Sequence, residues 1–99
     1  MDAKRIELFR KTNQEGTLIV DATLKEDGAI EIFFHDIGKT AENTWGNRDY
    51  ERSLTIPKDK LGLFALALIG ETFADDARAL SKVENLCKAH DIPTSGFSF

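Results

Sequence analysis

The clearest hydrophobic pattern in the chain is an alternation of apolar and polar residues between positions 17 and 34. It is interrupted once, by the turn-forming triplet Glu26-Asp27-Gly28. Alternation with a period of two residues is typical of a strand with one buried face. This stretch therefore predicts a β-hairpin, and its apolar positions are Leu18, Val20, Ala22 and Leu24 before the turn and Ile30, Ile32 and Phe34 after it.

The length of the turn decides which residues face each other. A two-residue Asp-Gly loop would pair Leu24 with Glu31 and place the two apolar sets on opposite faces. A three-residue loop with Gly28 in the left-handed conformation pairs Leu24 with Ile30 and buries both sets together. We therefore expect the second register. On the other face of the hairpin it places Ile19 opposite His35, Asp21 opposite Phe33, and Thr23 opposite Glu31.

Two further segments alternate in the same way. Residues 5–11 predict a first strand, with Ile6 and Leu8 on one side and Glu7 and Phe9 on the other. Residues 49–56 predict a fourth strand, in which a charged Arg52 interrupts the apolar set and indicates an edge position. Residues 36–48 show no periodicity and are expected to form a long loop.

The second half of the chain has helical periodicity. Pro57 suits the first position of a helix. Leu61, Phe64, Ala65 and Leu68 then form a stripe that Leu63, Leu66, Ala67 and Ile69 widen. Gly70 is expected to end this helix. A capping box of Thr72 and Asp75 is expected to start a second helix, which runs to about His90. Phe97 and Phe99 predict a short final strand or arm.

The predicted fold class is α+β, in a single domain of residues 1–99. It consists of a four-stranded antiparallel sheet with two C-terminal helices on one face and a short C-terminal aromatic strand or arm. The chain is 41% hydrophobic and 30% charged, as soluble globular proteins are. No apolar run approaches the roughly 18 residues of a membrane span, and the N-terminus carries no signal-peptide pattern. A cytoplasmic protein with no membrane partner is therefore expected.

Candidate chemistry is sparse in this sequence. Cys87 is the only cysteine, and His35 and His90 are the only histidines. A metal site at His35 would need carboxylates from Asp21, Glu31 or Asp36, so a surface histidine without a metal is the favoured interpretation. No nucleophile, phosphate-binding or metalloprotease motif is present. We therefore expect a protein that is not an enzyme and has no cofactor or metal.

Two surfaces are candidates for binding a partner. The first is the long loop and the strand after it, with Trp45, Asn47, Arg48, Asp49 and Tyr50, because Trp, Tyr and Arg are enriched at binding hot spots. The second is the open face of the sheet, with Phe9, Ile19, Phe33 and His35. This face could be covered by the C-terminal arm, by a second copy of the chain in a homodimer, by another protein, or by nucleic-acid bases stacked on the aromatic rings.

Several short motifs together resemble a known group of proteins. They are Asp36-Ile37-Gly38, the run Trp45-Gly46-Asn47-Arg48-Asp49-Tyr50-Glu51, Leu54-Thr55-Ile56-Pro57, Ala89-His90-Asp91-Ile92-Pro93 and Phe97-Ser98-Phe99. The chain resembles small bacterial proteins of uncharacterised role, some of which look like immunity proteins that neutralise toxins. An aspartate stands here where that group has a glycine before its isoleucine-proline pair. The order of four strands and a helix is also similar to single-stranded-DNA-binding domains of the coactivator/Whirly type.

The function expected from the sequence is therefore that of a small cytoplasmic protein-binding domain, immunity-like or homodimeric. The alternative is a single-stranded nucleic-acid-binding domain that uses the open sheet face. A formal net charge of −4 weighs against the alternative, since nucleic-acid binding rests largely on Lys and Arg at phosphates.

Overall fold

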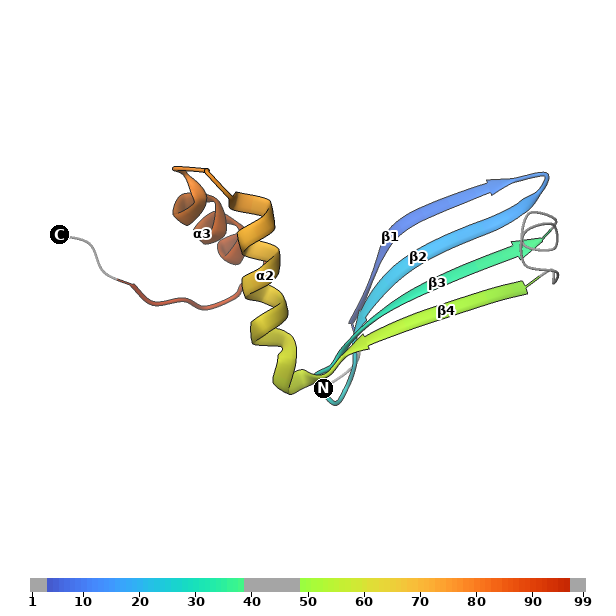
Figure 1. The fold of residues 1–99 in the computed structure, drawn as a ribbon, viewed down its shortest axis with the longest axis horizontal. Coiled ribbons are helices and arrows are strands. Elements are labelled where there is room, and N and C mark those ends of the chain that lie inside the picture. The colour runs from blue at the N-terminus through green and yellow to red at the C-terminus, as the bar shows by residue number, and fades with distance from the viewer. Residues whose placement is uncertain (1–3, 39–48, 97–99) are drawn as a thin grey trace. The chain divides into compact units, whose positions relative to one another are not determined.

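The computed structural model describes residues 4–38 and 49–96, and it confirms the α+β class. Four strands form one antiparallel sheet in the order β1-β2-β3-β4, and a short 3-10 turn and two helices follow (Figure 1). The chain divides into two compact units, Met1–Phe64 and Ala65–Phe99, which are described separately. The bounds are β1 (Lys4–Asn13), β2 (Gly16–Leu24), β3 (Ile30–Gly38), β4 (Asp49–Ile56), η1 (Lys58–Lys60), α2 (Leu61–Phe73) and α3 (Ala79–Ala89).

The central hairpin has the expected register. Leu24 pairs with Ile30 and Val20 pairs with Phe34. Gly28 has φ +92°, the left-handed conformation that the three-residue loop requires. The loop is closed by the Gly28 amide donating to the Lys25 carbonyl at 2.9 Å. Turn chemistry and hydrophobic alternation therefore determine this register together.

The first strand departs from the expected alternation. Glu7 pairs with Asp21, but the next paired residue is Phe9, which lies opposite Val20. Leu8 is the extra residue of a β-bulge, and such a residue changes which face the following side chains occupy. Phe9 therefore lies on the face of Val20, and the prediction that it joins Ile19 and Phe33 is wrong.

The segment predicted as a loop from residue 36 begins as strand. Asp36, Ile37 and Gly38 continue β3, and Gly38 lies opposite Gly16 at the end of the ladder. Both glycines have positive φ, +118° and +141°, where a side chain would meet the neighbouring backbone. The predicted loop residues Trp45, Asn47 and Arg48 lie outside the described residues. The fourth strand has the predicted bounds and forms a sheet edge.

The end of α2 and the start of α3 differ from the predicted ones, whereas α3 ends at Ala89, close to the predicted His90. Pro57 precedes η1, and α2 continues through Gly70 to Phe73, so Gly70 does not end it. The predicted capping box is also wrong, because Thr72 is within α2 and Asp75 has φ +59°. At the start of α3 the carboxylate of Asp76 accepts the Arg78 amide at 2.8 Å.

The end of α3 is well defined. Asp91 has φ +55°, and the Ile92 amide donates to the Cys87 carbonyl at 2.9 Å. This combination is a Schellman motif, which satisfies carbonyls that a helix end leaves open. In the described part of the chain no helix is long and apolar enough to cross a membrane. The placement of the helices on the sheet and the C-terminal aromatic arm stay predictions.

Candidate interaction faces of the sheet

The sheet has one face that is mainly hydrophobic, which we call the apolar face. It runs across all four strands, since directly paired residues point to the same side. Its edge residues are open to solvent, with Ile6 62% and Leu54 53% exposed. Its members are Ile6, Phe9, Leu18, Val20, Ala22, Leu24, Ile30, Ile32, Phe34, Tyr50, Leu54 and Ile56.

Aromatic side chains occupy the apolar face from its middle to the end near the β1–β2 turn. The ring of Phe34 meets that of Tyr50 edge-on, with centroids 6.1 Å apart and an interplanar angle of 71°. Phe9 of edge strand β1 is 48% exposed, although it lies opposite Val20 of the central strand β2. Aromatic rings contribute large contact areas to interfaces, so this end of the face is a strong contact surface.

The charges on the apolar face are mainly positive. Lys4 and Lys11 come from edge strand β1 and Arg52 from edge strand β4, and all three are exposed. Asp36 shares this face but is only 6% exposed. Cations on edge strands also discourage unwanted pairing of strand edges.

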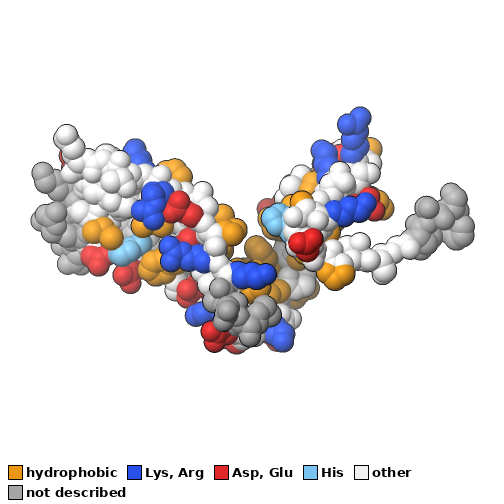
Figure 2. Space-filling model, turned by 180° about the vertical axis from the view of Figure 1, so that it is seen from behind, with side chains coloured by type: hydrophobic (Ala, Val, Ile, Leu, Met, Phe, Trp, Pro, Cys, Tyr) orange, Lys and Arg blue, Asp and Glu red, His pale blue; other side chains and the backbone are white. Residues whose placement is uncertain are grey.

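The opposite side of the sheet, which we call the mixed face, carries Ile19 and Phe33 among charged residues. Arg5 approaches Asp21 with an N–O distance of 3.2 Å, and Arg10 pairs with a carboxylate of the same strand at 2.7 Å. Acidic and basic side chains are interspersed over the sheet unit in the view of Figure 2. A shallow hollow on this face brings Ile19, Phe33 and His35 together as predicted, without Phe9.

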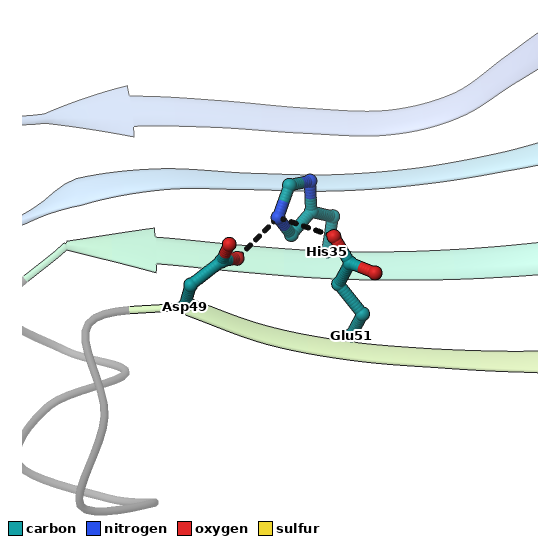
Figure 3. A group of neighbouring side chains, drawn as sticks. All are labelled: His35, Asp49 and Glu51. Carbon is teal, nitrogen blue, oxygen red and sulfur yellow. Dashed lines mark hydrogen bonds and ion pairs between the residues drawn. The ribbon is translucent and has the colours of Figure 1, made fainter.

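The most closely spaced chemistry of the mixed face is a histidine between two carboxylates (Figure 3). The Nε2 atom of His35 pairs with Asp49 and lies 3.4 Å from Oε1 of Glu51. Asp49 was predicted to belong to a binding loop with Tyr50. The structure separates these two residues, since Asp49 is on the mixed face and Tyr50 is on the apolar face.

The sequence suggested the wrong carboxylates for His35. Of the three proposed, Asp21 pairs with Arg5, Glu31 lies opposite Thr55, and Asp36 is on the apolar face. The carboxylates that do meet His35 come from β4. The register of β3 with β4 would identify them, but no short turn in the sequence specifies that register.

Helix α2 is hydrophobic on two sides. Leu61, Phe64 and Leu68 follow one another at helical spacing on one side, and Leu63, Leu66 and Ile69 lie on the other. Leu63 and Leu66 are 66% and 68% exposed. A helix that is apolar all round needs cover on more than one side.

Hydrophobic burial is small within each of the two units, taken alone. Ala29, at 5% exposed, is the one hydrophobic residue in the described part of the chain that is buried. Stable domains depend on the burial of apolar surface, which must offset a large loss of chain entropy. The two units therefore require further cover for their hydrophobic surfaces.

Comparison of this chain with protein-family models, with curated proteins and with solved structures found no match.

Proposed function

We propose that this protein is a non-enzymatic protein-binding domain that forms a homodimer by covering its apolar face with a second copy of the chain. The observation that supports this proposal is a four-strand apolar face in a sheet unit that, taken alone, buries only Ala29 among its described hydrophobic residues. Obligate interfaces have this character, since they resemble a hydrophobic core divided between two chains.

A second copy is the occupant that best meets the need for constant cover. A unit that buries little hydrophobic surface on its own depends on cover for folding, so a partner that supplies this cover must be present in equal amount whenever the chain is made. Homodimers meet this condition by construction, and their interfaces are the most apolar class. In a two-fold arrangement the exposed Lys4, Lys11 and Arg52 side chains would remain at the solvated rim.

The alternative to a homodimer is that helix α2 of the same chain covers the apolar face of the sheet. If the Leu61 and Phe64 side of α2 were used for that purpose, the Leu63 and Leu66 side would still lack cover. Cover of the sheet by one side of α2 would therefore leave the other side for a further contact, which α3 or a second copy of the chain would supply.

The proposal is tested by an isotope-filtered NMR experiment on a mixture of labelled and unlabelled chains. We expect intermolecular nuclear Overhauser contacts to methyl groups of the apolar face, such as Ile6 and Leu54. Intermolecular contacts confined to the mixed face, around Ile19, would overturn the assignment. A mixture with no intermolecular contacts, together with intrachain contacts from α2 to Leu54, would replace the homodimer by self-coverage.

The alternative function, binding of single-stranded nucleic acid, gains support from the apolar face and not from the face first expected to bind. The exposed Arg52 lies directly opposite Phe34 there, and base stacking needs both cationic and aromatic groups. Fluorescence anisotropy of labelled single strands at two salt concentrations distinguishes the two functions. Binding that weakens steeply with salt would favour the nucleic-acid function, and no binding at low salt would exclude it.

The resemblance to immunity proteins supports a different protein, such as a toxin, as another occupant of the apolar face. A hetero-complex of this kind would compete with the homodimer and dissociate it, since both complexes would use the residues of the apolar face. Capture of partners by the wild-type chain, compared with capture by a variant carrying Leu54→Lys, tests this occupant. A partner retained equally by both would have to bind elsewhere.

A further inference from the structure

We propose that His35, Asp49 and Glu51 form a binding site for a divalent transition-metal ion, with zinc as the reference ion. The site lies on the mixed face and is separate from the proposed dimer surface. One imidazole nitrogen and two carboxylate oxygens make up a donor set that zinc accepts. The three donor atoms lie within 4.8 Å of one another.

The sheet itself brings these donors together. His35 in β3 lies directly opposite Glu51 in β4, and Asp49 is two residues before Glu51 on the same side of its strand. The three side chains point toward one another in Figure 3. Nε2 of His35 and Oε1 of Glu51 are 3.4 Å apart, and two ligands about 2.1 Å from one tetrahedral zinc ion are separated by about 3.4 Å.

The arrangement of charges also favours a cation. Nε2 carries at most one hydrogen, yet it faces oxygens of two carboxylates. A single hydrogen can make a good bond with only one of them. A divalent ion between the three atoms would satisfy Nε2 and both oxygens at once, and it would neutralise the two negative charges.

The surroundings of the site restrain the ring of His35 and leave the two carboxylates accessible to an ion from solvent. The ring of His35 is 21% exposed and meets Phe33 edge-on at 5.8 Å, which restricts its orientation. Asp49 and Glu51 are 61% and 56% exposed, so an ion can reach them from solvent. Three protein ligands leave a fourth position for water, as in open zinc sites.

The test is isothermal titration calorimetry of the full chain with zinc chloride, with ¹H–¹⁵N spectra to locate the ion. We expect one ion per chain and shifts centred on His35 and Glu51. His35→Gln and Glu51→Gln should each weaken binding by at least about tenfold, since even loss of a ligand's outer partners has that effect. The matched controls are His90→Gln, at the end of α3, and Glu31→Gln, on the mixed face outside the cluster. Both should bind zinc as the wild type does.

Four results would overturn the site, and the first three concern the binding of zinc. They are no detectable zinc binding by a wild-type chain whose spectrum is folded, equal binding by wild type and Glu51→Gln, and loss of binding in His90→Gln. Magnesium chloride provides a further comparison, because magnesium prefers all-oxygen sites. Equal affinity for magnesium and zinc would indicate attraction by surface acids alone and would also overturn the proposal. Circular dichroism of each variant establishes that lost binding is not lost folding.

Discussion

Replacing Leu54 by lysine tests the role of the apolar face at one position in an exposed edge strand. Leu54 lies opposite Ile32 and is 53% exposed in the sheet. In the proposed homodimer this exposed half would be covered by the second chain. Thr55 is its matched control, because the next residue of the strand points to the mixed face, opposite Glu31.

The expected loss of dimer affinity follows from the exposed part of the Leu54 side chain that the second chain would cover. Full burial of a leucine side chain stabilises by about 1.5–3 kcal/mol, so covering half of Leu54 contributes roughly 0.8–1.6 kcal/mol per chain. A two-fold interface uses the residue twice, which gives about 1.6–3.2 kcal/mol, or roughly a 10- to 200-fold change in dimer affinity. Burial of the lysine ammonium adds to this cost.

Sedimentation velocity over a dilution series measures the dissociation constant of each variant. Leu54→Lys should raise it by at least about tenfold, whereas Thr55→Lys should change stability by no more than about 0.5 kcal/mol and leave association unchanged. Circular dichroism controls for folding. If both variants associate as the wild type does, Leu54 is not in the interface and the reasoning about the apolar face is refuted.

Four further predictions concern the fold. Gly16→Ala should lower the free energy of unfolding by about 1–3 kcal/mol or more, because at φ +141° its Cβ would lie 1.9 Å from a backbone oxygen of β3. Gly62→Ala meets nothing within 4 Å and should raise stability by about 0.5–1 kcal/mol. Lys82 and the Arg78 amide hold the pKa of Asp76 below its ordinary value of 3.8, so α3 should lose this contribution as the pH falls through that lower pKa. Val20→Asp should unfold the sheet, because the proposed cover of the apolar face would bury an unpaired charge there at a cost of several kcal/mol.

Each of these has a direct measurement and a contrary result. Urea unfolding compares the two glycine variants, and equal stability of Gly16→Ala and wild type would contradict the described close approach. The amide shift of Arg78 in a pH titration should have a midpoint below 3.8, and Asp76→Asn should abolish it; a midpoint above that value would contradict the hydrogen bonds. A Val20→Asp chain with a native far-UV spectrum would mean that Val20 is not covered.

The sequence was most informative where the determining contacts are local. The hairpin register depends on a three-residue turn and on alternation within 18 residues, and both point to the same pairing. The bulge at Leu8 carries no turn residue or glycine, so nothing in the sequence marks the point where Phe9 changes face.

Helix ends and the His35 cluster were predicted less well because competing or distant interactions determine them. Gly70 is compatible with a helix end, but the left-handed residue that follows α2 is Asp75. The meeting of His35 with Asp49 and Glu51 depends on how β4 aligns with β3. That alignment follows a connection too long for turn chemistry to specify, so spacing along the chain did not identify the partners of His35.

Sedimentation equilibrium of the wild-type chain, combined with urea unfolding at several protein concentrations, tests the central claim most directly. The homodimer predicts a mass of twice 11.1 kDa and an unfolding midpoint that rises with concentration, because association and folding are linked. A mass of 11.1 kDa at all concentrations, with an unfolding midpoint that does not depend on concentration, would contradict the claim that a second copy covers the apolar face.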